Sequence, residues 1–356
     1  MRREAPRSAG GGHRPLPSRR TFAVILLLTS LLAGAGEAGA AREMVGAEGG
    51  AFDQRLVVQA VVMDPVGGRE AVAAAMAAVS EIEMLLDPVA GVVQRLNDRA
   101  GKGPQVVDPQ LFRFLQRSLE FCHWSENRHG PLGGWLYTLW GLRQPVSALP
   151  GAEAMERGRQ LAACDNVRLD ARARTVELAP QTRVEPWGFA AGFAVDRAVE
   201  VLAAAGVDNA TVLVGGVQRG VGGGPDGRGW ALLLPPMPER LAEMLDGLRL
   251  SGRSIAVAAA TIDGELRLGG ERYPPYVDQR QGRPAVGELA LSVAAASELA
   301  LDAQGVAVTC FVAGSRHGML LVGQLRPAPA VVWAYGGGGR GLVTDYRWST
   351  AEGTLP

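Results

Sequence analysis

The stretch EPWGFAAGFAVDRAVE at residues 185–200 leads into GVDNATVLVGG at 206–216. Glycines bracket the start of the first segment and apolar residues fill the rest, which predicts a helix near 189–205. In the second segment a β-branched run at 211–214 ends in a pair of glycines, which predicts a short strand followed by a bend. A helix followed closely by a strand is the unit from which the rest of the fold can be worked out.

Strand and helix signals continue on both sides of that unit without a regular repeat. The run RLVVQAVVM at Arg55–Met63 predicts a strand, and apolar residues at helical spacing over 69–86 predict a helix. Asp108 followed by Pro109 predicts another helix start, because Asp caps helices and Pro suits the first helical position. This order favours the α+β class, with mixed sheets and packed helices in one domain over 41–356. Further strands are predicted at 167–169, 175–178, 230–234, 254–259, 273–277, 288–294, 319–325 and 330–335, and further helices at 238–248 and 297–312.

The composition excludes several classes of protein. The chain has 356 residues, of which 47% are hydrophobic and 20% charged, so it can bury a large core and is not a disordered protein. Lys plus Arg number 36 and Asp plus Glu number 36, which gives a net charge of zero. Nucleic acid is therefore not an expected partner.

Three cysteines and four histidines give no zinc-binding pattern. Cys122, Cys164 and Cys310 form no CxxC, and one of them must stay unpaired in any disulfide scheme. Cys122 falls in the helical pattern that begins at Pro109, so we expect it to serve as a small core residue. A metal, if the protein holds one, must then be bound by oxygen ligands.

Residues 1–40 have the composition of an export signal peptide. An arginine-rich start is followed by the apolar run TFAVILLLTSLLAGAG and by small residues ending at Ala40. The apolar stretch from Phe22 to Ala33 is shorter than the roughly 20 residues that span a bilayer, and we expect no transmembrane segment in the mature chain. SRRTF at 18–22 also resembles a twin-arginine signal. We therefore expect an exported protein of the periplasm or cell envelope.

Three ordered blocks carry a family resemblance: EPWGFAAGFAVDRAVE at 185–200, GVDNATVLVGGVQRGVGGGPDGRGW at 206–230 and ERYPPYVDQRQGRPAVG at 271–287. In order and spacing they resemble the FAD:protein FMN transferases, the ApbE-type flavin transferases. The resemblance covers roughly residues 52–325. It implies an α+β envelope protein that binds FAD and, with Mg²⁺, transfers FMN to a Thr hydroxyl of a redox partner protein.

Most charged and polar positions that the resemblance assigns to the family's chemistry carry apolar or small residues in this chain. A family Lys falls on Ala191, an Asp falls on Gly130, and an Asn and an Asp fall on Leu213 and Val217. A family His falls on Pro275, whose side chain has no donor or acceptor. The resemblance therefore leaves the catalytic residues of this chain unidentified.

The family's metal-binding pair, an Asp and a Thr four residues apart on one helix, falls on Gln304 and Val308. The nearby Asp302 and Thr309 share a helix face, but seven residues rise about 10.5 Å. Both can reach one Mg²⁺ only if the helix breaks near Gly305. Asp302 and Thr309 are thus the candidate metal ligands, conditional on that break.

Other positions keep the family's residues. An alternative for Asp196 is an acid on a helix face that pairs with a neighbouring Arg, and for Asp278 it is a loop ion pair with Arg280. The glycine pair either admits a close approach of the flavin or only bends a strand. The resemblance implies the following contacts to the flavin cofactor: Gly188, Gly192, Asp196, Gly215, Gly216, Tyr273 and Asp278.

Three functions remain open at this point. The first is an FAD:protein FMN transferase whose magnesium-dependent activity is weakened or lost, unless Asp302, Thr309, Gln304 and Asp278 rebuild its site. The second is a non-catalytic periplasmic protein that uses the same fold to bind a flavin, a nucleotide or a partner protein. The third is a periplasmic structural protein whose pocket is filled. The replacement of so many polar groups by apolar or small ones favours weakened or lost transfer.

Overall fold

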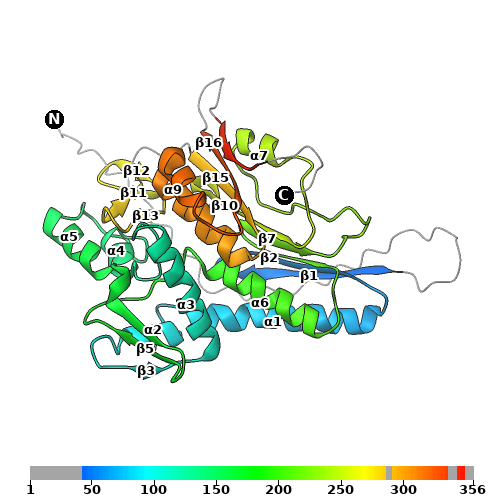
Figure 1. Cartoon of the computed structure of the whole chain (residues 1–356), viewed down its shortest axis with the longest axis horizontal. Helices are drawn as coiled ribbons and strands as arrows, with labels where there is room; N and C mark the ends of the chain where they lie inside the picture. Colours follow the sequence, from blue (N-terminus) through cyan, green and yellow to red (C-terminus); the bar gives the residue numbers. More distant parts are fainter. Residues whose placement is uncertain (1–41, 286–290, 336–342, 349–356) are drawn as a thin grey trace, which may run out of the picture.

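A computed structural model of the chain describes residues 42–285, 291–335 and 343–348, so the predicted signal peptide lies outside the described residues. The largest element is an eight-stranded sheet in the order β1-β2-β6-β7-β10-β15-β16-β17 (Figure 1). Every neighbouring pair in it is antiparallel. The α+β class is confirmed. The strands are β1 (Glu43–Ala51), β2 (Gln54–Val62), β6 (Ala210–Val214), β7 (Val217–Val221), β10 (Arg253–Ala259), β15 (Leu291–Ser297), β16 (Ala330–Tyr335) and β17 (Val343–Tyr346).

Both faces of the sheet are buried along its central strands. Successive side chains of a strand point to opposite faces, and on these strands each face packs into a hydrophobic core. On β10, Ala256 and Ala258 belong to the larger core, whereas Ile255 and Val257 belong to a smaller one. The larger core includes residues of four long helices: α1 (Pro65–Leu86), α3 (Pro109–Trp124), α6 (Ala190–Ala204) and α9 (Ala300–Val322). The smaller core packs against α7 (Glu239–Leu245), β8 (Trp230–Ala231) and β9 (Arg249–Leu250).

Helix starts follow the local sequence signals. The side chain of Asp108 accepts a hydrogen bond from the amide of Gln110 at the start of α3 (Pro109–Trp124), as its N-cap prediction requires. Asp64 caps α1 in the same way, with Pro65 at the first helical position. Both predicted helices are confirmed.

A second lobe, which lies away from the main sheet in Figure 1, is built from short elements around α3. It contains α2 (Val92–Asn97), α4 (Gly134–Leu139), α5 (Ala152–Leu161), the 3₁₀ turn η1 (Cys164–Asn166) and a small sheet of β3 (Gln105–Val106), β5 (Thr175–Leu178) and β4 (Val167–Asp170). The remaining short elements flank the main sheet: α8 (Ala260–Asp263), β11 (Leu266–Leu268), β12 (Glu271–Tyr273), β13 (Val277–Asp278) and β14 (Arg283–Pro284).

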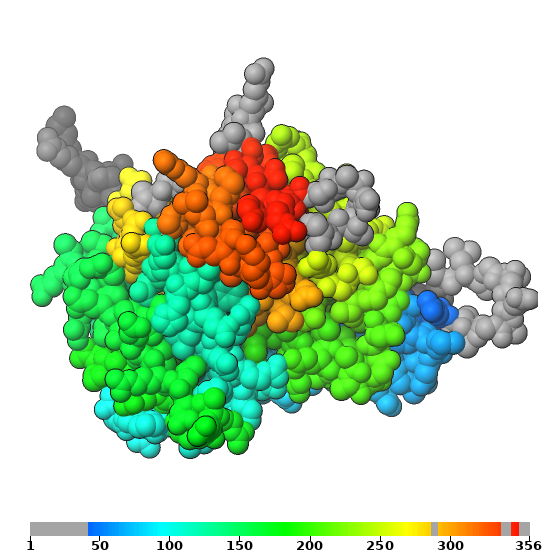
Figure 2. Space-filling view, viewed as in Figure 1, coloured from blue at the N-terminus to red at the C-terminus, as the bar shows by residue number. Residues whose placement is uncertain are grey.

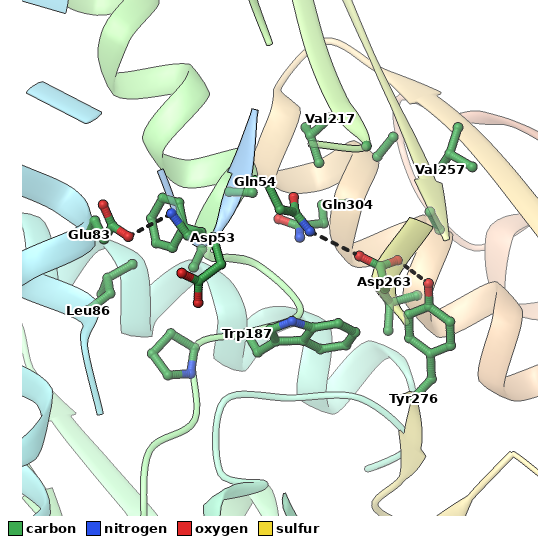
Figure 3. Close-up of a pocket in the computed structure, with 18 of the residues that line it drawn as sticks. Asp53, Gln54, Glu83, Leu86, Trp187, Val217, Val257, Asp263, Tyr276 and Gln304 are labelled. Carbon is green, nitrogen blue, oxygen red and sulfur yellow. Dashed lines mark hydrogen bonds between the residues drawn. The ribbon is translucent and has the colours of Figure 1, made fainter. Parts of the chain in front are cut away.

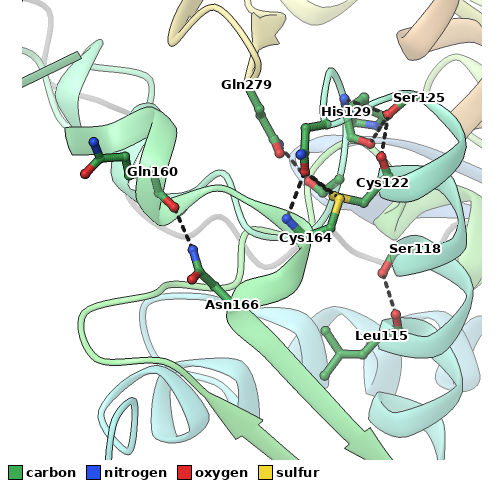
Figure 4. Close-up of a disulfide and its surroundings, with 11 residues drawn as sticks. Leu115, Ser118, Cys122, Ser125, His129, Gln160, Cys164, Asn166 and Gln279 are labelled. Carbon is green, nitrogen blue, oxygen red and sulfur yellow. Dashed lines mark hydrogen bonds between the residues drawn. A yellow bond between two sulfur atoms is a disulfide. The ribbon is translucent and has the colours of Figure 1, made fainter. Parts of the chain in front are cut away.

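A disulfide closes this lobe and corrects the expectation for Cys122. Cys122, near the end of α3, is bonded to Cys164, and the two Cα atoms are 5.9 Å apart (Figure 4). Asn127, in the turn after α3, accepts a 2.8 Å hydrogen bond from the Cys164 amide. Cys310 is the free, buried cysteine. Helical spacing alone could not reveal the pairing, because the partner lies 42 residues along the chain.

The region after residue 309 differs from the prediction. The expected strand at 319–325 is helical, because α9 extends to Val322 beyond a kink at Gly314, where φ is 69°. A short apolar run does not by itself distinguish a strand from a buried helix. By length and apolar composition α9 is also the one described helix that could cross a bilayer, but most of it is buried against α6, β10 and β15. We therefore identify it as a core helix of the domain.

Candidate functional site

A cavity of about 260 Å³ lies where the helical layer meets the sheet (Figure 3). We call it the central cavity. Its wall is assembled from the tip of the β1–β2 hairpin, the C-terminal end of α1, the start of α6, the β6–β7 turn, β10 with α8, and the first half of α9. The lining residues are Phe52, Asp53, Gln54, Glu83, Leu86, Asp87, Pro88, Arg143, Pro186, Trp187, Ala190, Ala191, Gly216, Val217, Ala256, Val257, Asp263, Tyr276, Gln304, Ala307 and Val308.

One end of the central cavity carries a buried acid. The carboxylate of Asp263 accepts a hydrogen bond from the Tyr276 hydroxyl and a longer one, 3.4 Å, from the Gln54 side-chain amide. Burial raises the pKa of Asp263 to about 6, against the lowering effect of these hydrogen bonds. Burial likewise raises the pKa of Tyr276 well above its ordinary value, so the phenol stays protonated.

The opposite end is formed by the hairpin tip and α1. Phe52 and Asp53 are the two turn residues between β1 and β2, and both have positive φ, 54° and 59°. Two positive φ values suit the twist of a two-residue hairpin turn but are costly for a bulky residue such as Phe52. The Phe52 amide donates a 2.6 Å hydrogen bond to the carboxylate of Glu83. Burial, followed by repulsion from Asp53 and Asp87, raises the pKa of Glu83.

Aromatic side chains form the floor between these ends. Trp187 is partly exposed toward the central cavity, and its ring lies 5.4 Å from that of Tyr276. Tyr276 in turn packs 4.3 Å from Phe311. At the rim, Arg143 forms a bidentate ion pair with the buried Glu185. The guanidinium of Arg143 is thus already neutralised by a neighbour.

Four positions that the resemblance links to the family's chemistry come together in this wall. Ala191 begins α6, Val217 begins β7, and Gln304 and Val308 lie one turn apart on α9. The amide oxygen of Gln304 accepts a 2.8 Å hydrogen bond from the backbone N–H of Gly192. The positions converge as the resemblance implies, but the side chains there are apolar or neutral.

The predicted glycines hold the backbone close to the central cavity. Gly216 lines it, and Gly215 has φ of 54° in the turn, where an added Cβ would meet the Gln54 side chain at 1.5 Å. At Gly192 a Cβ would lie 2.5 Å from the carbonyl oxygen of Ala300, so this glycine lets α6 approach α9. At Gly188 a Cβ would lie 2.1 Å from the buried ring of His129.

Of the seven predicted flavin contacts, only Gly216 is among the residues that line the central cavity. Asp196, Tyr273 and Asp278 lie outside that lining, as do Gly188, Gly192 and Gly215. Asp196 accepts hydrogen bonds from the Ala300 and Leu301 amides at the start of α9 and pairs with Arg219. Asp278 pairs with Arg128 rather than with Arg280. Tyr273 packs against Trp140, with ring centres 5.7 Å apart.

Asp302 and Thr309 are not brought together. The helix stays regular at Gly305 and kinks only at Gly314. Asp302 forms a bidentate ion pair with Arg117 of α3, at 2.8 and 2.7 Å. Thr309 is fully buried. Both lie outside the lining of the central cavity.

The donor set of the described residues does not fit a magnesium ion. No group of three or more His, Cys, Asp or Glu side chains that could hold a metal occurs in the part of the chain that the structure describes. Gln304 and Val308 replace the carboxylate and hydroxyl that the resemblance implies, and Asp263 is held by Tyr276. We therefore derive no step through Mg²⁺.

A flavin ring, by contrast, fits the described residues. The ring system is flat and apolar with polar edges, and the central cavity offers Trp187, the apolar side chains of Ala191 and Val217, and the amides of Gln54 and Gln304. These neutral groups can stack against the ring and hydrogen-bond to its edges.

Sequence reasoning missed several residues of this site. Asp53, Glu83 and Asp263 were not identified, because their local sequences carry no motif. Asp53 lies in a turn, Glu83 on a helix face and Asp263 at the end of a short helix. Tyr276 and Trp187 lay inside recognised blocks, at 271–287 and 185–200, and there they were not assigned a role. The left-handed pair Phe52-Asp53 has no sequence signal, since such turns favour Asn-Gly or Asp-Gly.

The sequence profile of the ApbE family matches residues 52–333. The FAD:protein FMN transferase of Treponema pallidum (strain Nichols) is 27% identical over 260 residues, which cover 66% of this chain and 68% of that protein. The FAD:protein FMN transferase of Chlamydia trachomatis is 27% identical over 224 residues, covering 62% and 68%. The apo crystal structure of the Pseudomonas stutzeri flavinyl transferase ApbE superposes with a TM-score of 0.72 at 20% identity, covering 85% of this chain and 94% of that one. The ApbE protein of Thermotoga maritima gives a TM-score of 0.72 at 20% identity, covering 85% and 96%.

Proposed function

Because the chain belongs to the ApbE family, we propose that it binds a flavin in the central cavity and has weak or no magnesium-dependent FMN transfer. Family relatives named FAD:protein FMN transferases support the flavin part of the proposal. The second part rests on one observation. The cavity positions that the resemblance assigns to a Lys, an Asp and a metal-binding Asp and Thr carry Ala191, Val217, Gln304 and Val308.

The chemistry explains why those substitutions matter. Phosphoryl transfer from FAD builds negative charge on the pyrophosphate, and its acceleration depends on cations placed against that charge. The only cation among the described residues that line the central cavity is Arg143, and it is paired with Glu185. Neither Ala191 nor Val308 can replace such a group. Binding of the flavin ring does not require it.

The proposal is tested by incubating the mature protein with FAD, with Mg²⁺ or with EDTA, and measuring AMP by chromatography. The Treponema pallidum relative serves as a positive control. We expect AMP release close to the protein-free rate under both conditions, while FAD or another flavin raises the melting temperature of the protein through linkage. Turnover comparable to that of the control, abolished by EDTA, would show that transfer is retained. The absence of any flavin-dependent shift would contradict flavin binding.

We also propose that the protein is exported to the periplasm or cell envelope by the segment 1–40. The disulfide between Cys122 and Cys164 supports this, because such bonds form and persist in oxidising compartments. Mass spectrometry of the protein from fractionated cells should find a periplasmic form that begins near residue 41. A full-length cytoplasmic form as the main product would contradict export. If transfer survives, its acceptor is a Thr of a redox partner protein.

A further inference from the structure

The charges that line the central cavity are unequally distributed. Four carboxylates reach it, those of Asp53, Glu83, Asp87 and Asp263, and the one lining cation in the described chain, Arg143, is paired with Glu185. Glu83 and Asp53 lie together at one end, and Asp263 lies at the other (Figure 3). A negatively charged ligand entering from either end therefore meets a carboxylate.

The pKa values of two of these acids are raised, mainly by burial, and for Glu83 also by repulsion from neighbouring acids. The pKa of Glu83 is raised by burial and by repulsion from Asp53 and Asp87. The pKa of Asp263 is raised to about 6 by burial. The central cavity thus already disfavours part of its own negative charge, and a further anion brought among these groups adds to that cost.

The surface between the acids is neutral. It consists of the indole of Trp187, the amides of Gln54 and Gln304, the Gly216 backbone and small apolar side chains. The volume, about 260 Å³, lies near the lower end of the roughly 300–1,000 Å³ typical of small-molecule sites. That is space for one ring system, and the adenine half of a dinucleotide would have to lie outside it.

We propose that the central cavity selects an uncharged flavin, of the riboflavin class, over the phosphorylated flavins FMN and FAD. This rests on the proposed function, since it specifies which flavin occupies the same site. The ring stacks on Trp187 and the amides of Gln54 and Gln304 meet its polar edges. The polyol side chain can hydrogen-bond to carboxylates that repel a phosphate.

Isothermal titration calorimetry with riboflavin, FMN and FAD, in EDTA at pH 7.5 and low salt, tests the selection. We expect riboflavin to bind at least tenfold more tightly than FAD, because the phosphates of FAD carry the same sign of charge as the lining carboxylates and are repelled by them. The difference should shrink as salt is added, because salt screens the repulsion between the phosphates and the carboxylates. FAD binding as tightly as riboflavin in EDTA would overturn the proposal.

Two sets of variants separate charge from fit. The double variant Asp53→Asn with Glu83→Gln should raise FAD affinity and narrow the difference from riboflavin, because the new amides can still hydrogen-bond to the polyol but no longer repel a phosphate. Glu153→Gln, at an exposed position on α5, is the matched control and should change neither. Trp187→Ala should weaken riboflavin binding about tenfold, whereas Trp187→Phe should retain most of it. An unchanged selectivity in the double variant would contradict the role of the carboxylates.

Failure of the proposed flavin selectivity can be distinguished from failure of the proposed function. Strong magnesium-dependent AMP release would overturn the loss of transfer but would leave the order of affinities in EDTA to be decided by the titrations. If no flavin binds, both the flavin-binding proposal and the selectivity are wrong. If FAD binds more tightly than riboflavin and no AMP is released, only the selectivity is wrong.

Discussion

Asp263 holds its carboxylate between the Tyr276 hydroxyl and the Gln54 amide, and burial raises its pKa from 3.8 to about 6. Such a carboxyl group binds its proton more tightly in the folded state than in the unfolded state. The free energy of unfolding therefore falls as pH rises from 3.8 to about 6. The contribution of Asp263 to stability is therefore most favourable below about pH 4 and is lost by about pH 6 and above.

We expect Asp263→Asn to remove that dependence. The variant should match the wild type near pH 4. At pH 7 its free energy of unfolding should exceed that of the wild type by about 1–2 kcal/mol. This gain is smaller than the free energy that corresponds to the whole pKa shift of Asp263, because the Asn amide must find a new hydrogen-bond partner. Urea unfolding of both proteins at the two pH values measures the difference. A difference that is the same at both values would rule out titration of Asp263 as its cause.

The four substituted positions in the cavity wall lead to a gain-of-function prediction. Restoring the groups that the resemblance implies, with Ala191→Lys, Val217→Asp, Gln304→Asp and Val308→Thr together, should produce EDTA-sensitive AMP release from FAD at least tenfold above the wild type. The variant without Gln304→Asp and Val308→Thr is the control and should stay inactive. A folded quadruple variant without activity would mean that more than these groups has been lost.

Among the elements, the contact between α6 and α9 positions the start of α6 and Gln304 at the site. Gly192 permits it, because a Cβ there would lie 2.5 Å from the Ala300 carbonyl and 2.6 Å from the Leu301 Cα. Backbone atoms cannot move aside as a flexible side chain can. Asp196, one turn later on α6, accepts hydrogen bonds from the first two amides of α9 and fixes the register between the helices.

Gly192→Ala should therefore lower the free energy of unfolding by about 1–3 kcal/mol and weaken flavin binding, since Gln304 is hydrogen-bonded to the same residue. Gly151→Ala is the control, because nothing lies within 4 Å of a Cβ at that position. Chemical denaturation and calorimetry measure the two effects. Equal stability of both variants would show that the helices can separate without cost.

Local patterns were sufficient to predict some elements and not others. β2, α1 and α3 carry strong signals: the prediction placed β2 to within one residue at each end, the last residue of α1, and the start of α3 from its cap at Asp108. The end of α9 was not, because its apolar run after Gly314 is too short to show a helical period. At the site, the block resemblance located Ala191 and Gln304. Asp263 acquires its role only through Tyr276, thirteen residues later, and no local pattern encodes such a contact.

At the scale of the whole molecule, the disulfide links the two ends of the segment that carries α4 and α5. Cys122 and Cys164 lie 42 residues apart in sequence. The turn between Ser125 and Gly130, next to this bond, also supports the loop at 278–282, because Arg128 pairs with Asp278 and the Gly130 carbonyl accepts from Gln279.

The double variant Cys122→Ala with Cys164→Ala should lose about 4 kcal/mol in free energy of unfolding, from the chain entropy that a loop of this length restores to the unfolded state. The wild type under dithiothreitol should reach the same stability, which provides the control. Denaturation curves under oxidising and reducing conditions measure both. Curves that coincide for the oxidised wild type and the variant would show that the bond adds no stability.

Strand β1 is an edge of the main sheet and begins at Glu43, only a few residues after the expected cleavage point. Its far end delivers Phe52 and Asp53 to the central cavity. If the signal segment is removed near residue 41 as proposed, the cleavage point and the ligand site lie at the two ends of one nine-residue strand. Trimming by an exopeptidase into β1 would remove backbone hydrogen bonds to β2 and weaken the pairing that holds Phe52 and Asp53 in the wall of the central cavity.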